Sequence, residues 1–126
     1  MDLQTPLAKV RGLGSAKAGT GHFWMQRITA ITLIPLSLWM VSFTEHLLNS
    51  SYQEVVVWLA GPLDSILAIA WVIAAFYHAA LGLQVVVEDY VHSEWRKITT
   101  IWLIKLSFIF FAIAAIVAIF RISMIG

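Results

Sequence analysis

The sequence contains no cysteine. Disulfide bonds, thiolate zinc sites, iron–sulfur ligation and a thiol nucleophile are therefore excluded within this chain, and any metal here would be held by histidine or carboxylate. Charge is scarce as well, at 12% of the residues, and a net charge of +1 without a run of lysine or arginine gives no sign of a nucleic-acid partner. The sequence also shows no hydrolytic triad, phosphate loop or cluster of metal ligands. We therefore do not expect it to be an enzyme on its own.

Hydrophobic residues, in contrast, make up 60% of the 126 residues, and the mean hydropathy is +0.85. This composition is typical of a polytopic membrane protein. Three apolar stretches, at about residues 28–48, 65–87 and 98–120, are long enough to cross a hydrocarbon core of ~30 Å as helices. We predict an all-α membrane protein with three transmembrane helices, forming a single membrane anchor domain over residues 1–126.

Residues 1–27 form a basic segment before the first span. Up to Gly21 this segment has no apolar periodicity, which predicts a flexible region outside the bilayer. Its basic residues and glycines are Lys9, Arg11, Lys17, Gly12, Gly14, Gly19 and Gly21. The following HFWMQR, His22 to Arg27, combines aromatic and basic residues as a membrane interface does. The long apolar run that follows has no A-x-A-like site, so no secretory signal is expected and the chain is expected to be mature from its start.

Polar and helix-breaking residues interrupt the apolar sequence at three places. Pro35 lies inside the first span, where Thr32 is one candidate to satisfy the backbone carbonyl that a proline frees. Residues 49–64 contain a Gly-Pro pair and a VVVWL run too short to span, so a short interfacial helix is expected there. In the third span, Lys105 is expected to extend its ammonium group to the membrane surface and anchor the helix.

Lysine and arginine are distributed unequally between the two sides of the predicted bundle. One side holds Lys9, Arg11, Lys17, Arg27, Arg96 and Lys97, whereas the other holds Arg121 together with Glu45, Glu54 and Asp64. Basic residues favour the cytoplasmic side of a membrane. We therefore expect a cytoplasmic N-terminus, a periplasmic C-terminus and a multi-pass protein of the bacterial inner (cytoplasmic) membrane.

The second span carries one histidine, His78, deep within its apolar sequence. An ionisable residue at this depth is a functional hypothesis by default, because hydrocarbon offers it no hydrogen-bond partner. Haem ligation, a hydrogen bond to a neighbouring helix and proton relay are all open roles. The other histidines lie near the predicted surfaces, so a bis-histidine haem would need a partner subunit. Small residues around His78 leave room for close helix packing or for a flat cofactor: Ala74, Ala75, Ala79, Ala80 and Gly82.

Asp89 and Tyr90 follow at the end of the same span. Eleven residues make about three helical turns, so His78 and Asp89 are expected to share one face, roughly 16 Å apart. At the membrane surface the Tyr90 phenol can donate a hydrogen bond to a quinone carbonyl, with nearby groups supplying protons. The alternative is an interfacial tyrosine beside a helix-terminal acid.

The pattern His-x10-Asp-Tyr, present here as HAALGLQVVVEDY, resembles the hydrophobic membrane anchor subunit (the D subunit) of succinate dehydrogenase, respiratory complex II. The upstream HFWMQRITAITLIPL is similar to the start of that family's first span, where a histidine and an arginine precede a threonine-alanine pair. The connection and the third span match in hydropathy only.

This resemblance implies that His78 is an axial ligand of the haem b iron and that Tyr90 and Asp89 belong to a ubiquinone site, with His22 and Arg27 near the haem propionates. The partners implied are a cytochrome b556-type C subunit that supplies the second axial histidine, an iron–sulfur subunit and a flavoprotein subunit. The chain would then be a non-catalytic anchor that helps pass electrons from succinate to ubiquinone, in the tricarboxylic acid cycle and respiratory electron transport. The alternatives are a fumarate reductase anchor, or a small haem-free transporter or assembly protein.

Overall fold

The computed structural model describes residues 5–10 and 17–125, and every regular element in these ranges is a helix. The helices are α1 (Pro6–Val10), α2 (Lys17–Asn49), α3 (Tyr52–Leu59), α4 (Pro62–Tyr90) and α5 (Glu94–Ile125). Within the described residues, α2, α4 and α5 are long and apolar enough to cross a membrane. The predicted fold class, an all-α protein with three helices of spanning length, is confirmed.

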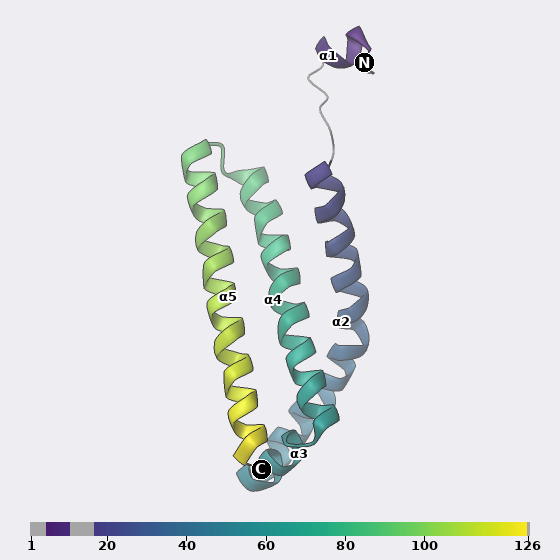
Figure 1. Cartoon of the computed structure of the whole chain (residues 1–126), viewed down its shortest axis with the longest axis vertical. Coiled ribbons are helices and arrows are strands. Elements are labelled where there is room, and N and C mark those ends of the chain that lie inside the picture. Colours follow the sequence, from purple (N-terminus) through teal and green to yellow (C-terminus); the bar gives the residue numbers. More distant parts are fainter. Residues whose placement is uncertain (1–4, 11–16, 126) are drawn as a thin grey trace.

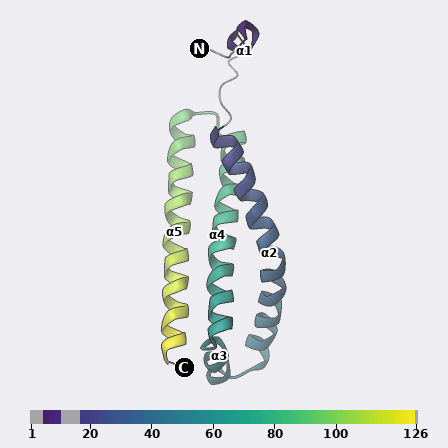
Figure 2. The same ribbon diagram turned by 45° about the vertical axis from the view of Figure 1, so that its right-hand side comes forward.

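The three long helices lie side by side, with α4 between α2 and α5 and packed against both (Figure 1). The short helix α3 lies across one end of this bundle and contacts all three long helices (Figure 2). None of the residues of α5 is buried, and large apolar side chains such as Phe110 and Phe111 are exposed. Because an apolar surface of this extent is not stable in water, lipid or other protein subunits must cover it.

The N-terminal part of α2 differs from the sequence prediction. The composition predicts an irregular segment up to Gly21, but α2 already begins at Lys17, and α1 covers Pro6–Val10. Glycine costs about 1 kcal/mol relative to alanine in a helix, yet extending an existing long helix by one turn needs no new nucleus. Arg11, Gly12 and Gly14 lie outside the described residues.

Pro35 does not interrupt α2, which continues through it to Asn49. A proline inside a helix removes one backbone donor and frees the carbonyl four residues earlier, here that of Ile31. The expected role of Thr32 at this carbonyl is wrong, because its hydroxyl donates to the carbonyl of Ile28 at 2.8 Å. Threonine side chains in helices commonly bond to the carbonyl one turn back in this way.

The expected short helix between the first two spans is present as α3, and a capping box starts it. The Glu54 N–H donates to Ser51 Oγ at 3.4 Å, and the Ser51 N–H donates to the Glu54 carboxylate at 2.7 Å. Two otherwise unpaired backbone donors are satisfied reciprocally. The backbone donor of Ser51, followed by its hydroxyl, holds the pKa of Glu54 below its usual value.

We expect acidification to loosen the start of α3. Because the folded pKa of Glu54 is lowered, its stabilisation is present above the unfolded value of about 4.3 and is lost as the pH falls through the folded value. Glu54→Gln keeps an N3 side chain able to accept the Ser51 N–H but does not titrate. Hydrogen exchange of the α3 amides, corrected for intrinsic rates, should lose protection at low pH in the parent and not in Glu54→Gln. Equal pH dependence in both proteins would contradict this assignment.

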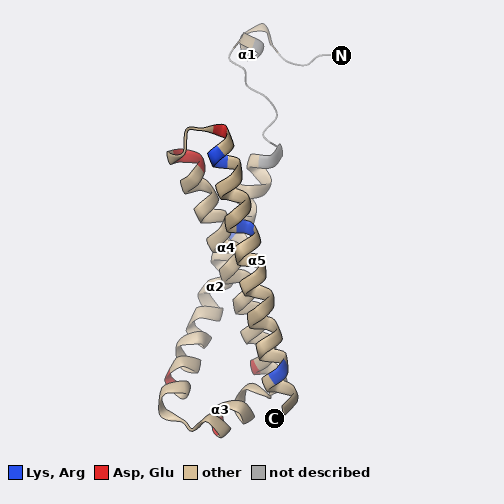
Figure 3. Cartoon of the chain, turned by 90° about the vertical axis from the view of Figure 1, so that its left-hand side faces the viewer, with Lys and Arg blue, Asp and Glu red and all other residues tan. Residues whose placement is uncertain are grey.

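Charged residues gather toward the two ends of the bundle (Figure 3). The connection end, defined as residues 88–97, contains Glu88, Asp89, Glu94, Arg96 and Lys97, with Lys97 Nζ 3.6 Å from a Glu94 oxygen. The opposite end, where α3 lies, has Glu45, Glu54, Asp64 and Arg121. Lys105 lies between them on α5, with Nζ 5.7 Å from the ring centroid of Trp102, one turn nearer the connection end. The anchoring role expected for Lys105 stays a prediction.

Candidate functional site

Two contacts between α2 and α4 show how these antiparallel helices pair. Thr29 Oγ1 of α2 lies 2.9 Å from His78 Nδ1 of α4. One turn nearer the connection end, Gln26 Nε2 lies 3.8 Å from the point that a Cβ on Gly82 would occupy. Polar residues therefore follow one line between the two helices toward the connection end. We call this line the α2–α4 seam: His22, Gln26, Thr29 and His78.

His78 is half-buried in the seam, and its ring is held from the Nδ1 side by Thr29. Thr29 is only 7% exposed, and its hydroxyl oxygen also lies 2.7 Å from the Met25 carbonyl and 3.1 Å from the Gln26 carbonyl. A hydrogen bond to a neighbouring helix, one of the roles expected for His78, is thus present. It uses Nδ1, and none of the described residues is hydrogen-bonded to Nε2.

Two polar atoms of the seam are buried and have no hydrogen-bond partner among the described residues: Nε2 of His22 and Oε1 of Gln26. A buried polar group left unpaired costs about 1–3 kcal/mol. Such groups in a native protein usually meet water, a ligand or another chain. Since His22 and Gln26 are one helical turn apart on one face, the seam offers two adjacent polar contacts to whatever lies there.

Arg27 is on a different side of α2 from this seam. Five residues after His22 correspond to a rotation of about 140° around the helix. The Arg27 side chain is exposed, and its guanidinium carbon lies 4.7 Å from the ring centroid of Phe23. The structure therefore places the sequence-predicted pair His22 and Arg27 on different sides of α2.

Asp89 and Tyr90 are the last two residues of α4, which is one continuous helix from Pro62. Both side chains are exposed, Tyr90 by 78%. Among the described residues, neither side chain has a hydrogen-bond partner. Because α4 is unbroken between His78 and Asp89, the condition for their shared face is met, and ordinary helical rise puts Tyr90 about 18 Å along the axis from His78.

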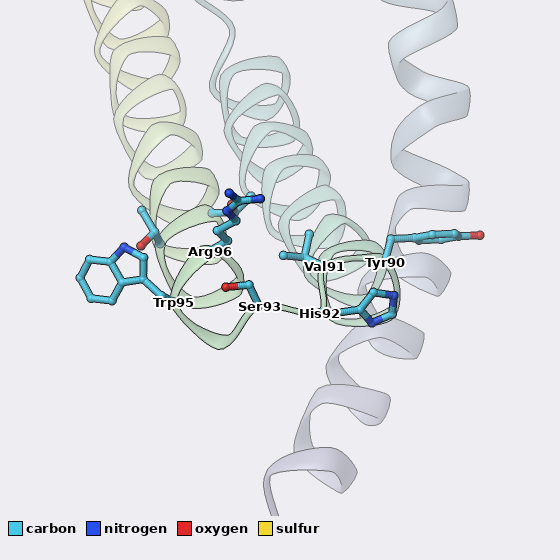
Figure 4. Close-up of a pocket in the computed structure, with 8 residues that line it drawn as sticks. Tyr90, Val91, His92, Ser93, Trp95 and Arg96 are labelled. Carbon is cyan, nitrogen blue, oxygen red and sulfur yellow. The ribbon is translucent and has the colours of Figure 1, made fainter.

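A cavity of about 590 Å³ lies at the connection end, and Tyr90 is part of its lining. The lining residues are Tyr90, Val91, His92, Ser93, Trp95, Arg96, Thr99 and Thr100. Figure 4 shows the rings of Tyr90 and Trp95 pointing to opposite sides, with the Arg96 side chain between the α4 and α5 ribbons in that view. The volume of the cavity is in the range of small-molecule pockets. Asp89 does not line this cavity, whereas His92 and Arg96, which the sequence reasoning did not select, do.

Aromatic rings gather at the opposite end of the bundle. Trp58 of α3 stacks on Phe43 and Trp39 of α2, with ring centroids 5.1 and 5.7 Å apart, and the ring of His46 lies 5.3 Å from that of Trp58. Trp39 Nε1 also donates to Asp64 Oδ1 at 3.3 Å. The ring contacts hold α3 against α2, and the hydrogen bond holds α2 against the start of α4. The expected structural role of His46 at the membrane interface agrees with this packing.

No three His, Asp or Glu side chains come together as a metal site in the described part of the chain. The one described histidine that lies within the middle of a spanning helix is His78.

Comparison with known proteins identifies the family to which this chain is similar. Residues 1–119 match the family model described as "Succinate dehydrogenase/Fumarate reductase transmembrane subunit". The succinate dehydrogenase hydrophobic membrane anchor subunit of Rickettsia bellii (strain RML369-C) is 40% identical over 119 residues, which cover 94% of this chain and 95% of the relative. The corresponding subunit of Paracoccus denitrificans is 25% identical over 120 residues, covering 95% and 92% of the two chains. No solved structure shows a significant match.

Proposed function

Since the chain belongs to the succinate dehydrogenase/fumarate reductase transmembrane subunit family, we propose that His78 gives one axial ligand to haem b and that the connection end forms part of a ubiquinone site. As a membrane anchor subunit of succinate dehydrogenase, the chain is a multi-pass membrane protein and part of an enzyme complex. The observation that carries the proposal is the position of His78. Its ring is held through Nδ1 in the middle of a spanning helix, and its Nε2 has no partner among the described residues.

The seam has the properties that a haem ligand from this chain needs. The small residues Ala74 and Gly82, one turn before and after His78, add little bulk beside its ring on the face of α4 that packs against α2. Nε2 of His22, which is buried and has no hydrogen-bond partner among the described residues, can donate to a carboxylate. Arg27 lies on another side of α2 and would need a different side-chain conformation to bind a second carboxylate. Haem b, when bound, supplies one-electron transfer, and its second axial ligand would come from the C subunit.

At the connection end the phenol of Tyr90 can donate a hydrogen bond to a carbonyl oxygen of ubiquinone. Asp89, the residue before it, can hold a proton for the reduction that gives ubiquinol. The iron–sulfur subunit would complete this site, and the flavoprotein subunit would oxidise succinate. This chain would then bind and orient ubiquinone and supply protons to it at the membrane surface. It would take no part in succinate chemistry.

Affinity purification of the tagged chain tests the function as a whole. We expect flavin, iron–sulfur protein and haem to copurify with it from detergent-solubilised membranes, together with succinate:ubiquinone reductase activity. The family description covers fumarate reductase too, and the ratio of succinate oxidation to fumarate reduction distinguishes the two anchors. Purification without flavin or haem would favour the haem-free transporter or assembly protein.

We also propose that the N-terminus and the connection end face the cytoplasm, and that α3 and the C-terminus face the periplasm of a bacterial inner membrane. In the described residues the positive charge outside the spans supports this, with Arg96 and Lys97 at the connection end. The chain has no cysteine, so a single introduced thiol reports one position. A membrane-impermeant maleimide on intact spheroplasts should label Gln53→Cys and not Ser93→Cys, and after permeabilisation it should label both. The reverse pattern would overturn this orientation.

A further inference from the structure

The hydroxyl of Thr29 faces three acceptors or potential acceptors but has only one proton to give. Its oxygen lies 2.7 Å from the Met25 carbonyl, 3.1 Å from the Gln26 carbonyl and 2.9 Å from His78 Nδ1. The two carbonyls can only accept a hydrogen bond. With the shortest of the three distances, the Met25 carbonyl takes the hydroxyl proton, as is usual for a threonine inside a helix. A lone pair of the Thr29 oxygen then faces Nδ1.

A lone pair facing Nδ1 requires that this nitrogen carry a proton. A neutral imidazole has a single N–H, so a proton on Nδ1 leaves Nε2 with a free lone pair. That is the form in which a histidine binds a metal through Nε2, and the group that holds the other nitrogen selects it. The opposite arrangement, with Thr29 donating to Nδ1, would protonate Nε2 and leave the Met25 and Gln26 carbonyls without the hydroxyl proton.

We propose that Thr29 is a positioning residue that keeps the proton of His78 on Nδ1 and thereby presents Nε2 to the haem iron. This inference rests on the proposed haem site. Burial supports it, because Thr29 is 7% exposed and water has little access to compete for Nδ1. The hydrogen bond to the Met25 carbonyl also fixes the Thr29 oxygen with respect to α2. When the Thr29 oxygen accepts a hydrogen bond from Nδ1–H, Nε2 becomes a stronger electron-pair donor to the iron. A stronger electron-pair donor favours ferric over ferrous iron.

The test compares Thr29→Val, Thr29→Ser and Thr32→Val in the purified complex. Valine keeps the shape of threonine and removes the hydroxyl, whereas serine keeps the hydroxyl. Thr32 is the matched control, because its hydroxyl makes the same bond one turn back, to Ile28 at 2.8 Å, while the side chain is exposed. In Thr29→Val we expect haem retention to weaken about 10–100-fold, the usual effect of losing such a supporting group. Its haem midpoint potential should rise. Thr29→Ser and Thr32→Val should resemble the parent.

The outcomes separate this inference from the function on which it rests. Absence of a b-type haem in the parent complex would defeat the proposed function itself. A parent with haem, but a Thr29→Val complex with unchanged haem content, potential and low-spin spectrum, would overturn the role of Thr29 alone. Equal losses of haem in Thr29→Ser and Thr29→Val would show that Thr29 acts through packing and not through its hydroxyl, which would overturn the inference. If Thr29→Val does not assemble, Thr29→Ala, which also removes the hydroxyl but leaves a smaller side chain, takes its place in the same measurements of haem content, potential and low-spin spectrum. Weaker haem retention and a raised potential in Thr29→Ala support the inference, and parent values of both overturn it.

Discussion

Replacing His78 with alanine is expected to remove or loosen haem b in the purified complex and to abolish its six-coordinate, low-spin spectrum. His78 is the one described histidine in the middle of a spanning helix, so no other described histidine lies at that depth to replace it as a ligand. Loss of a group that only supports a ligand costs about 10–100-fold in affinity, and loss of the ligand itself should cost at least as much. The ratio of haem to flavin in the purified complex measures the effect.

His92→Ala is the matched control for this experiment. His92 is exposed in the short connection after α4, so its removal should leave the ratio of haem to flavin unchanged. The melting temperature provides a second readout, since a cofactor that binds only the folded complex stabilises it by mass action. A His78→Ala complex with the haem content and low-spin spectrum of the parent would show that His78 is not a ligand. In that case its hydrogen bond to Thr29 would be a packing contact between helices.

Replacing Tyr90 with phenylalanine is expected to lower kcat/KM for ubiquinone about 10–100-fold. A hydrogen bond to a group that becomes charged is worth about 1.5–3 kcal/mol, and about 1.4 kcal/mol corresponds to a factor of ten in rate. Succinate oxidation with an artificial acceptor that bypasses the quinone should be unchanged, because Tyr90 is at the end of α4 on the membrane anchor. Steady-state rates with the two acceptors give both values.

Tyr77→Phe makes the same chemical change on the same helix and serves as the control. Tyr77 is 43% exposed and lies on the side of α4 that faces α5, away from the connection end. Its replacement should leave both rates as in the parent. Unchanged ubiquinone kinetics in Tyr90→Phe, or a loss of similar size in Tyr77→Phe, would remove Tyr90 from the quinone site.

The spans could be predicted from the sequence because the signal is local. A stretch of about twenty mainly apolar residues is long enough to span a membrane, and as a helix it satisfies its own backbone hydrogen bonds there. The helix ends could not be predicted as well, since they depend on caps. Helix α4 begins at Pro62 and includes Asp64, which the sequence reasoning placed in the connection. Proline is favoured at the first helical position and an acid in the first turn, so both residues start the helix.

The candidate site was predictable only in part, for a related reason. His78 is conspicuous by its depth, but the importance of Thr29 depends on a contact between residues 49 positions apart, and hydropathy does not give the register of α2 against α4. Gln26 could have been found from the spacing of His22, Gln26 and Thr29, which is that of one helical face. The same spacing argument would have placed Arg27 on a different face of α2 from His22.

The measurement that most directly tests the haem assignment is a reduced-minus-oxidised optical spectrum of the detergent-purified complex that contains this chain. We expect a low-spin, b-type signal in the parent, and the loss or a shift of that signal in His78→Ala. No such signal in a parent complex that retains its flavin and iron–sulfur subunits would contradict haem ligation and leave His78 with helix packing or proton relay.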